Sequence, residues 1–193
     1  MNPRIRNVRK LLLSDNWYTL NKVVFDYQMP DGQWVEQMRE SYDRGNGAAV
    51  LLYNLKKRTV ILISQFRMPT YLNGNESGMM IEACAGLLDG DDPETCVIKE
   101  AEEESGFRVS KVEKIYEAYM SPGAVTEVVH LYIGEYEESD RVGAGGGLEE
   151  EHEDISVLEL DFDKAIEMME NGKIRDAKTI ILLQHLRLLG LMR

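Results

Sequence analysis

The chain has 193 residues, 44% of them apolar, which suits one domain with a sizeable hydrophobic core. Its 22 basic and 34 acidic residues give a net charge of −12, which argues against a general electrostatic grip on nucleic acid but allows an anionic substrate bound through a metal ion. The two cysteines lack C-x-x-C spacing, so we expect neither a disulfide scaffold nor a zinc site. The N-terminal leucine run is too short for a signal peptide or a membrane span. We therefore expect a soluble cytoplasmic protein with no membrane partner and no nucleic-acid partner.

Residues 17–44 predict a β-hairpin, because two runs rich in Val, Tyr and Phe flank the turn sequence Pro30-Asp31-Gly32. Apolar runs typical of further strands follow along the chain at 48–55, 59–66, 79–84, 114–119, 128–136 and 155–160. The sequence therefore predicts an N-terminal antiparallel β segment over residues 1–43 and a main domain over residues 44–193.

Three helices are predicted between and after these strands. The first begins at Asp92, an N-cap acid followed by proline, and stops at Gly106. Asp161 starts a second helix that runs to Asn171, and the last covers about 177–189. The order of strands, helix, strands and helices indicates a mixed α+β class.

The first of these helices carries an unusual acidic face. Glu100, Glu103 and Glu104 are three and four residues apart, so their carboxylates share one side of the helix and repel one another. Val97 and Ala101 place the apolar stripe on nearly the same side. Acids turned toward the core need a cation, and oxygen ligands favour a hard divalent metal, Mg²⁺ before Ca²⁺. The plain alternative is a solvated acidic helix face.

Read from Gly86, the segment GLLDGDDPETCVIKEAEEESGF resembles the Nudix box. Lys99 stands where the box has arginine, and we expect it still to orient a neighbouring carboxylate. The loop after Gly86 is one residue short, so its first acid falls on Asp91. The matching positions of the box are Glu100, Ala101, Glu103, Glu104, Gly106 and Phe107.

Motifs outside the box resemble one branch of the Nudix family, the bacterial GDP-mannose hydrolases, which are related to the ADP-ribose pyrophosphatases. These motifs are residues 42–47, 65–67, 73–78, 82–86, 121–123 and 174–179. The resemblance implies an α/β/α sandwich with a mixed sheet, and Mg²⁺-dependent hydrolysis of GDP-mannose to GMP and mannose 1-phosphate, with Mn²⁺ as an alternative metal. It also implies a homodimer that exchanges its N-terminal β segments.

The same resemblance implies roles for individual residues. It implies that the Ala85 carbonyl, Glu100, Glu104 and an acid of the late loop hold the metal, with Glu153 as the best match for that acid and Glu151 as the runner-up. The catalytic acids are Glu100, Glu103, Glu104, Glu151 and Glu153. The substrate contacts are Trp17, Arg39, Glu40, Arg67, Ala85, Gly86, Leu87, Glu127 and Lys178.

The acidic run that follows the glycines of residues 143–147 suits a mobile lid that carries the catalytic base. Glu149, Glu150, Glu151 and Glu153 are the candidates for that base.

Two other functions stay open at this point. ADP-ribose hydrolysis uses the same chemistry, and Ser121-Pro122-Gly123 follows the box at a distance also seen in ADP-ribose enzymes. A non-catalytic module that senses a nucleotide sugar is the alternative of another class, and the intact acids argue against it. A nucleic-acid decapping enzyme conflicts with the net charge of −12.

Overall fold

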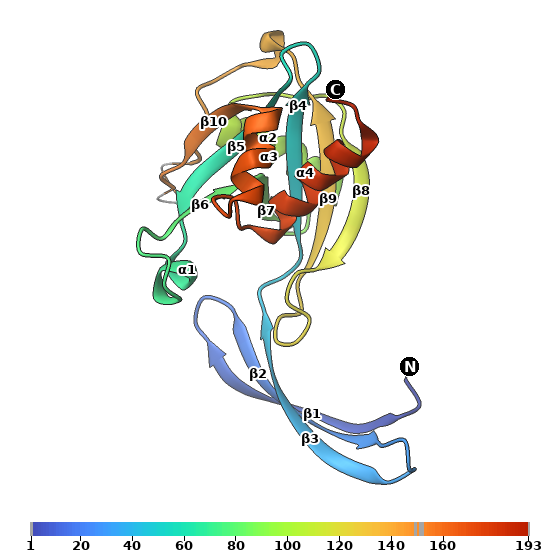
Figure 1. The fold of residues 1–193 in the computed structure, drawn as a ribbon. Coiled ribbons are helices and arrows are strands. Elements are labelled where there is room, and N and C mark those ends of the chain that lie inside the picture. The colour runs from blue at the N-terminus through green and yellow to red at the C-terminus, as the bar shows by residue number, and fades with distance from the viewer. Residues whose placement is uncertain (1, 149, 151–152, 193) are drawn as a thin grey trace. The chain divides into compact units, whose positions relative to one another are not determined.

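The computed structural model describes residues 2–148, 150 and 153–192. The chain divides into two compact units (Figure 1). The first unit comprises the chain up to Asn46 together with Tyr119–Val128, and the second comprises Gly47–Ala118 together with the chain from Val129 onward.

The first unit is an antiparallel sheet with the strand order β1-β2-β3. Its strands are β1 (Ile5–Asp15), β2 (Thr19–Gln28) and β3 (Trp34–Asp43). Gln28 pairs with Trp34 across the turn, which confirms the predicted hairpin. The loop of residues 119–128 joins this unit through two backbone hydrogen bonds with Tyr42. The Tyr42 N–H donates to the Ala124 carbonyl (2.8 Å), and the Thr126 N–H donates to the Tyr42 carbonyl (3.0 Å).

Strand β1 lies within the β segment predicted for residues 1–43, but the sequence did not predict a separate strand over Ile5–Asp15. Its pairing with β2 shifts register between Arg6 and Arg9 and again between Leu12 and Ser14. Each shift inserts an irregularity that breaks the alternation of side chains, so the strand has no clear two-residue period to recognise.

The second unit is built on a seven-stranded mixed sheet whose main order is β10-β5-β4-β9-β8. Strands β4 and β9 run parallel, and β4 pairs antiparallel with β5. The strands are β4 (Gly47–Asn54), β5 (Thr59–Phe66), β6 (Met79–Glu82), β7 (Cys84–Leu87), β8 (Glu113–Tyr119), β9 (Val128–Glu135) and β10 (Ser156–Asp161).

The predicted strand over 79–84 is in fact two short strands. β4 and β5 pair only from Leu52 to Asn54, and beyond that point β6 pairs with β5 while β7 pairs with β4. The segment from Met79 to Leu87 thus fills the space where the two long strands diverge. Two of the residues expected in the site, Ala85 and Gly86, lie on β7.

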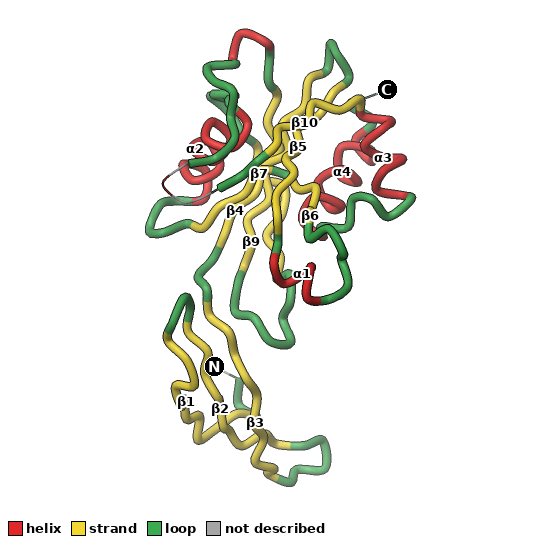
Figure 2. Tube along the Cα trace, turned by 90° about the vertical axis from the view of Figure 1, so that its left-hand side faces the viewer, coloured by secondary structure: helices red, strands yellow, loops and turns green. Residues whose placement is uncertain are grey.

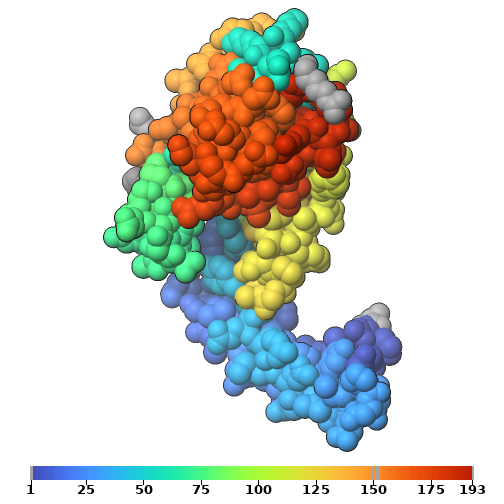
Figure 3. Space-filling view, in the orientation of Figure 1, coloured from blue at the N-terminus to red at the C-terminus, as the bar shows by residue number. Residues whose placement is uncertain are grey.

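Helices cover both faces of this sheet. Figure 2 shows α2 (Pro93–Ser105) on one side, and α3 (Phe162–Glu170) and α4 (Ala177–Leu189) on the other. In Figure 3 the orange and red side chains of α3 and α4 form a continuous cover. The short α1 (Met68–Leu72) and the 3₁₀ turn η1 (Glu138–Asp140) lie outside these layers. The predicted α+β class and α/β/α sandwich are confirmed.

Helix α2 has the ends that its sequence predicts. The Asp92 side chain accepts hydrogen bonds from the N–H groups of Glu94 and Thr95, and Gly106 closes the helix in the left-handed region with φ 79°. The helix buries Val97 and Ala101 completely against the sheet, within a core that also contains Val50, Leu52, Ile61, Ile63, Phe107 and Tyr136. Within the part of the chain that the structure describes, no helix has the length and apolar character needed to cross a membrane.

The glycine-rich segment of residues 142–147, here called the glycine strap, is bonded to the C-terminal end of α2. Backbone N–H groups of the strap bind carbonyls that the helix cannot satisfy itself. These bonds are Gly147 to Glu103 (3.1 Å), Gly146 to Glu104 (2.9 Å), and Val142 to Gly106 (2.9 Å). The glycines of the strap are thus fixed to α2, and the acidic run expected to act as a lid lies partly outside the described residues.

We expect Gly145→Ala to lower the free energy of unfolding by about 2 kcal/mol, because Gly145 has φ +70° and a Cβ there would lie 2.5 Å from the Glu104 carbonyl oxygen. Urea denaturation measures this change. Gly143→Ala is the matched control, since its Cβ meets nothing closer than 3.9 Å. Equal stability of the two variants would show that the strap is not packed as described.

Candidate active site

Glu104 is a buried carboxylate, with 2% of its surface exposed. Together with Glu100 and Glu153 it forms what is here called the acidic group. Glu104 Oε2 accepts a hydrogen bond of 2.9 Å from the backbone N–H of Ala85 on β7. Burial raises the pKa of Glu104 to about 8, and the charges of Glu100 and Glu153 add to the rise, while the Ala85 N–H and Arg67 oppose it. The metal-free protein therefore holds a carboxyl group that resists ionisation near neutral pH.

Glu100 lies one helical turn before Glu104 and packs on Gly86. A Cβ added to Gly86 would lie 1.8 Å from Oε1 of Glu100, so the carboxylate occupies the space that a side chain would fill. Gly86 is on β7 next to Ala85. The absence of a side chain at residue 86 thus lets Glu100 reach the strand that also binds Glu104.

Glu153 comes to the same acidic group from the segment that follows the glycine strap. Its Oε2 accepts a hydrogen bond of 3.0 Å from the Leu148 N–H, and the side chain packs on Gly147, where a Cβ would lie 2.4 Å from that oxygen. Since the strap is bonded to α2, it carries Glu153 toward Glu104.

Glu103 forms an ion pair with a lysine of the same helix. Lys99 Nζ lies 3.8 Å from Glu103 Oε1, one turn along α2. Lys99 therefore lies near a carboxylate, and its expected role in orienting that carboxylate stays a prediction. The Lys99 side chain is 60% exposed, so the pair is a surface interaction of small energy.

A group of four charged side chains, here called the cation cluster, lies beside the acids. Arg67 donates to both oxygens of Glu82, from Nε at 2.8 Å and from Nη2 at 3.1 Å. Lys178 Nζ lies 2.5 Å from Glu82 Oε2 and 3.0 Å from Asp176 Oδ1. Arg67 also lowers the pKa of Glu104, so the cluster and the acids interact electrostatically.

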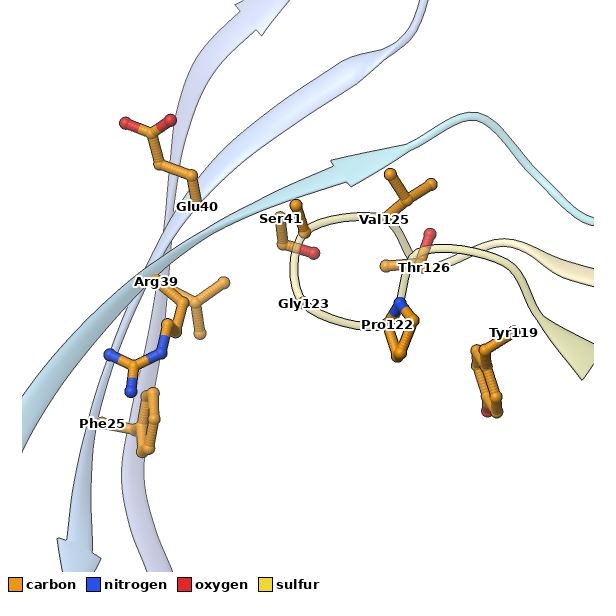
Figure 4. Close-up of a pocket in the computed structure, with 11 residues that line it drawn as sticks. Phe25, Arg39, Glu40, Ser41, Tyr119, Pro122, Gly123, Val125 and Thr126 are labelled. Carbon is orange, nitrogen blue, oxygen red and sulfur yellow. The ribbon is translucent and has the colours of Figure 1, made fainter. Parts of the chain in front are cut away.

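The first unit contains a pocket of about 580 Å³, lined by Val23, Phe25, Arg39, Glu40, Ser41, Tyr119 and residues 122–126 (Figure 4). Val23 and Arg39 pair directly across β2 and β3, so their side chains share one face of the sheet. Figure 4 shows Arg39 beside Phe25, while Glu40 points the opposite way, as the alternation of a strand requires.

Two family models match this chain. A family model described as the NUDIX domain matches residues 43–182, which is more than half of the chain. The chain belongs to the Nudix family. A second family model, described as the GDP-mannose pyrophosphatase NudK N-terminal domain, matches residues 4–42.

Curated relatives extend the match over the full length of this Nudix hydrolase. Proteins named GDP-mannose pyrophosphatase from Escherichia coli O1:K1 / APEC and from E. coli strain UTI89 / UPEC are each 54% identical to it, over 192 residues and 100% of both chains. The protein of that name from E. coli strain K12 / DH10B is 53% identical with the same coverage.

Nudix hydrolases generally use divalent metal cations, and the acids of this Nudix hydrolase offer suitable ligands. The charges of Glu100 and Glu153 both raise the pKa of the buried Glu104, so the three carboxylates interact electrostatically. Among the described residues, no three His, Cys, Asp or Glu side chains are arranged as a metal site. Carboxylate oxygens are the ligands that a hard divalent cation prefers, so the chemistry of these side chains fits such an ion.

Other residues expected in the site of this Nudix hydrolase are placed as follows. Trp17 is 84% exposed. Glu127 Oε1 lies 3.6 Å from Arg44 Nε. The Leu87 carbonyl accepts from Cys96 Sγ at 3.3 Å. Glu150 is exposed, and Glu149 and Glu151 lie outside the described residues.

Glu82 and Asp176 are the residues that sequence reasoning missed. Glu82 is the one acid in the apolar run of residues 79–84, and a charge in such a run signals a buried partner. Asp176 reads as the N-cap of α4, a role it does fill by accepting from Thr179 N–H at 3.0 Å. Its second contact, with Lys178, has no local signature.

The raised pKa of Glu104 predicts that stabilisation by a divalent cation grows with pH. The pKa of Glu104 in the folded protein, about 8, exceeds the ordinary value of 4.5. Protonation of Glu104 therefore stabilises the folded protein without metal, fully below pH 4.5, and this stabilisation is lost as pH rises through 8. A cation needs the ionised carboxylate and so competes with the proton below pH 8. We expect the rise in Tm on adding Mg²⁺ to be larger near pH 8.5 than near pH 6, by differential scanning fluorimetry. Glu104→Gln should remove that difference, and an equal shift at both pH values would contradict the prediction.

Proposed function

We propose that this Nudix hydrolase is a Mg²⁺-dependent GDP-mannose pyrophosphatase that produces GMP and mannose 1-phosphate. The observation that carries the proposal is the 54% identity over the whole chain with proteins of that name. The match of residues 4–42 to the N-terminal family model adds weight, because it concerns the segment outside the common Nudix domain.

We assign the metal to Glu100, Glu104, Glu153 and the Ala85 carbonyl, with Mn²⁺ as the alternative ion. The support is the buried Glu104, whose pKa is raised by its surroundings and which interacts with both other carboxylates. When bound, the cation would neutralise the pyrophosphate and lower the pKa of a water molecule.

The protein groups have separate tasks in this proposal. Arg67 and Lys178 donate N–H bonds to phosphate oxygens and hold the diphosphate against the acids. Glu149, Glu150, Glu151 and Glu153 are the candidate acids for accepting the proton of the attacking water. Ala85, Gly86 and Leu87 of β7 contact the substrate in this proposal. Alanine at each acid of residues 149–153 identifies the base, which is the variant whose kcat collapses while Mg²⁺ binding is retained.

Four further residues are proposed as substrate contacts on the family resemblance. Arg39, which would hold a phosphate or the sugar, and Glu40 line the pocket of the first unit. Trp17 is exposed and available to stack on guanine, and Glu127 is the remaining assigned contact.

We also propose a homodimer that exchanges residues 1–43. The support is the N-terminal sheet, where Val24 is the sole apolar side chain among the described residues 2–46 that is buried within one chain. Its exposed apolar residues include Val8, Leu11, Leu12, Leu13, Val35 and Met38. A sheet of this size needs a covered face, and a second copy supplies one. Light scattering coupled to gel filtration tests the dimer. A cytoplasmic location stays a prediction.

Incubation of the purified protein with GDP-mannose and Mg²⁺ in ¹⁸O-labelled water, followed by mass analysis, tests the reaction. The expected products are GMP and mannose 1-phosphate, and the labelled product identifies the attacked phosphorus. ADP-ribose is the competing substrate, and a higher kcat/KM for it would overturn the substrate assignment. A panel of nucleotide sugars that all stay intact with Mg²⁺ and Mn²⁺ would overturn the reaction itself.

A further inference from the structure

One buried carboxylate in the second unit binds two cations from separate parts of the chain. Glu82 on β6 is 3% exposed and uses one oxygen for Arg67 Nε and the other for Arg67 Nη2 and Lys178 Nζ. Arg67 follows the end of β5, and Lys178 lies in the first turn of α4. Burial alone would raise the pKa of Glu82, but Lys178 and Arg67 outweigh it and lower the pKa to about 2. The two cations therefore favour the ionised form of Glu82.

Both cations keep hydrogen-bond donors after these contacts. Arg67 binds Glu82 through one edge of its guanidinium, which leaves the Nη1 edge directed away from that carboxylate, and its side chain is 40% exposed. Lys178 has three N–H donors and uses two of them for Glu82 and Asp176. A planar guanidinium held at one edge presents its other edge in a fixed direction. An arginine or lysine that is not held loses side-chain rotamer entropy when it binds a phosphate.

The backbone next to Glu82 connects the cation cluster to the acids. Ala83 N–H donates to Thr179 Oγ1 at 2.7 Å, which holds the start of α4 against this segment. Ala85 N–H donates to Glu104 at 2.9 Å. Residues 82 and 85 are three positions apart, a span of about 10 Å in extended chain. The segment from Glu82 to Ala85 thus sets how far the held cations lie from the acids.

We propose that Glu82 is a positioning residue that aims Arg67 and Lys178 together at the diphosphate of the substrate. This inference rests on the proposed function for its substrate and assigns a task to a residue that does not itself touch substrate. A purely structural role is the competing account, because removing one partner of a buried ion pair also destabilises a protein.

Two substitutions separate these accounts. Glu82→Asp keeps the charge but withdraws the carboxylate by one methylene, so it preserves neutralisation while moving both cations. Glu82→Gln keeps the shape and loses the charge. Glu159→Asp is the matched control, since Glu159 also accepts from a lysine, Lys57 at 3.1 Å, outside the cation cluster. Each protein is measured for Tm, for kcat and KM with GDP-mannose, and for the Kd of the non-hydrolysable α,β-methylene analogue of GDP with Mg²⁺.

We expect Glu82→Asp to raise KM and the Kd of the analogue about tenfold. Its kcat and its Mg²⁺ activation constant should stay within about twofold of wild type. The control variant Glu159→Asp should leave all of these values unchanged. In an Arg67→Ala background, Glu82→Asp should change the analogue Kd by less than about threefold, because Arg67, through which Glu82 mainly acts, is absent. If Glu82→Gln does not fold, the aspartate variant carries the test.

An analogue Kd that stays at the wild-type value in folded Glu82→Asp would overturn the inference. So would an undiminished effect in the Arg67→Ala background, or a wild type that does not bind the analogue. Wild-type protein that binds the analogue but leaves GDP-mannose intact would instead reject the proposed function and leave the positioning role to be judged on the Kd values alone.

Discussion

Glu104→Gln is expected to lower kcat for GDP-mannose hydrolysis about a thousandfold. The substitution removes a carboxylate from the proposed metal ligands and leaves the shape of the side chain unchanged. Its amide oxygen can still accept the Ala85 N–H bond that Glu104 accepts at 2.9 Å. The loss therefore reports on charge rather than on packing.

The same substitution should not destabilise the metal-free protein at pH 8. Glu104 is buried next to other carboxylates, which is why its pKa is raised to about 8, and a neutral amide avoids that electrostatic cost. Stability and activity are thus expected to change in opposite directions, as is common where a site holds charges that the fold alone does not favour.

Steady-state kinetics with Mg²⁺ and urea denaturation without it measure the two effects. Glu102→Gln is the control on the same helix, because Glu102 pairs with Arg108 at 2.7 Å away from the acids, and its kcat should stay within about twofold of wild type. A Glu104→Gln enzyme with more than a tenth of wild-type kcat would remove Glu104 from the metal ligands.

The helix that carries these acids could be predicted from the sequence because its signals are local. Asp92 and Pro93 mark its start and Gly106 its end, and all three fill those roles in the structure. The inward direction of Glu104 followed from its position relative to Val97 and Ala101, since a helix has a fixed angular repeat. The hairpin around Pro30-Asp31-Gly32 was predicted for the same kind of reason.

Features that depend on distant pairing could not be predicted. The split of residues 79–87 into two strands follows from the divergence of β4 and β5, which no local pattern records. Glu82 and Lys178 are 96 residues apart, so their ion pair required the fold. The anchoring of the glycine strap was missed because its bonds run between backbone groups, whereas the glycines themselves suggested only flexibility.

Gly86→Ala is expected to lower kcat/KM about a hundredfold with little change in stability. The new Cβ would lie 1.8 Å from Oε1 of Glu100 and 2.2 Å from its Cδ, so the carboxylate has to move. The end of a glutamate side chain moves at low cost, and we expect the free energy of unfolding to fall by less than about 1 kcal/mol. A displacement of about 1 Å in a reacting group is enough for an effect of this size on rate.

A second substitution can show that the loss acts through Glu100. Aspartate at position 100 is shorter by one methylene and vacates the space that the Gly86→Ala methyl group needs. If the two substitutions acted independently, their effects on kcat/KM would multiply in the double variant Gly86→Ala/Glu100→Asp. We expect a smaller loss than that product, with a kcat/KM close to that of Glu100→Asp alone. Independent, multiplicative losses would mean that the Gly86 methyl group acts on something other than Glu100, and the site would then need a different reason for the small residue on β7. Because the contact involves a side chain and not backbone, this coupling isolates how the strand positions one acid of the proposed metal site.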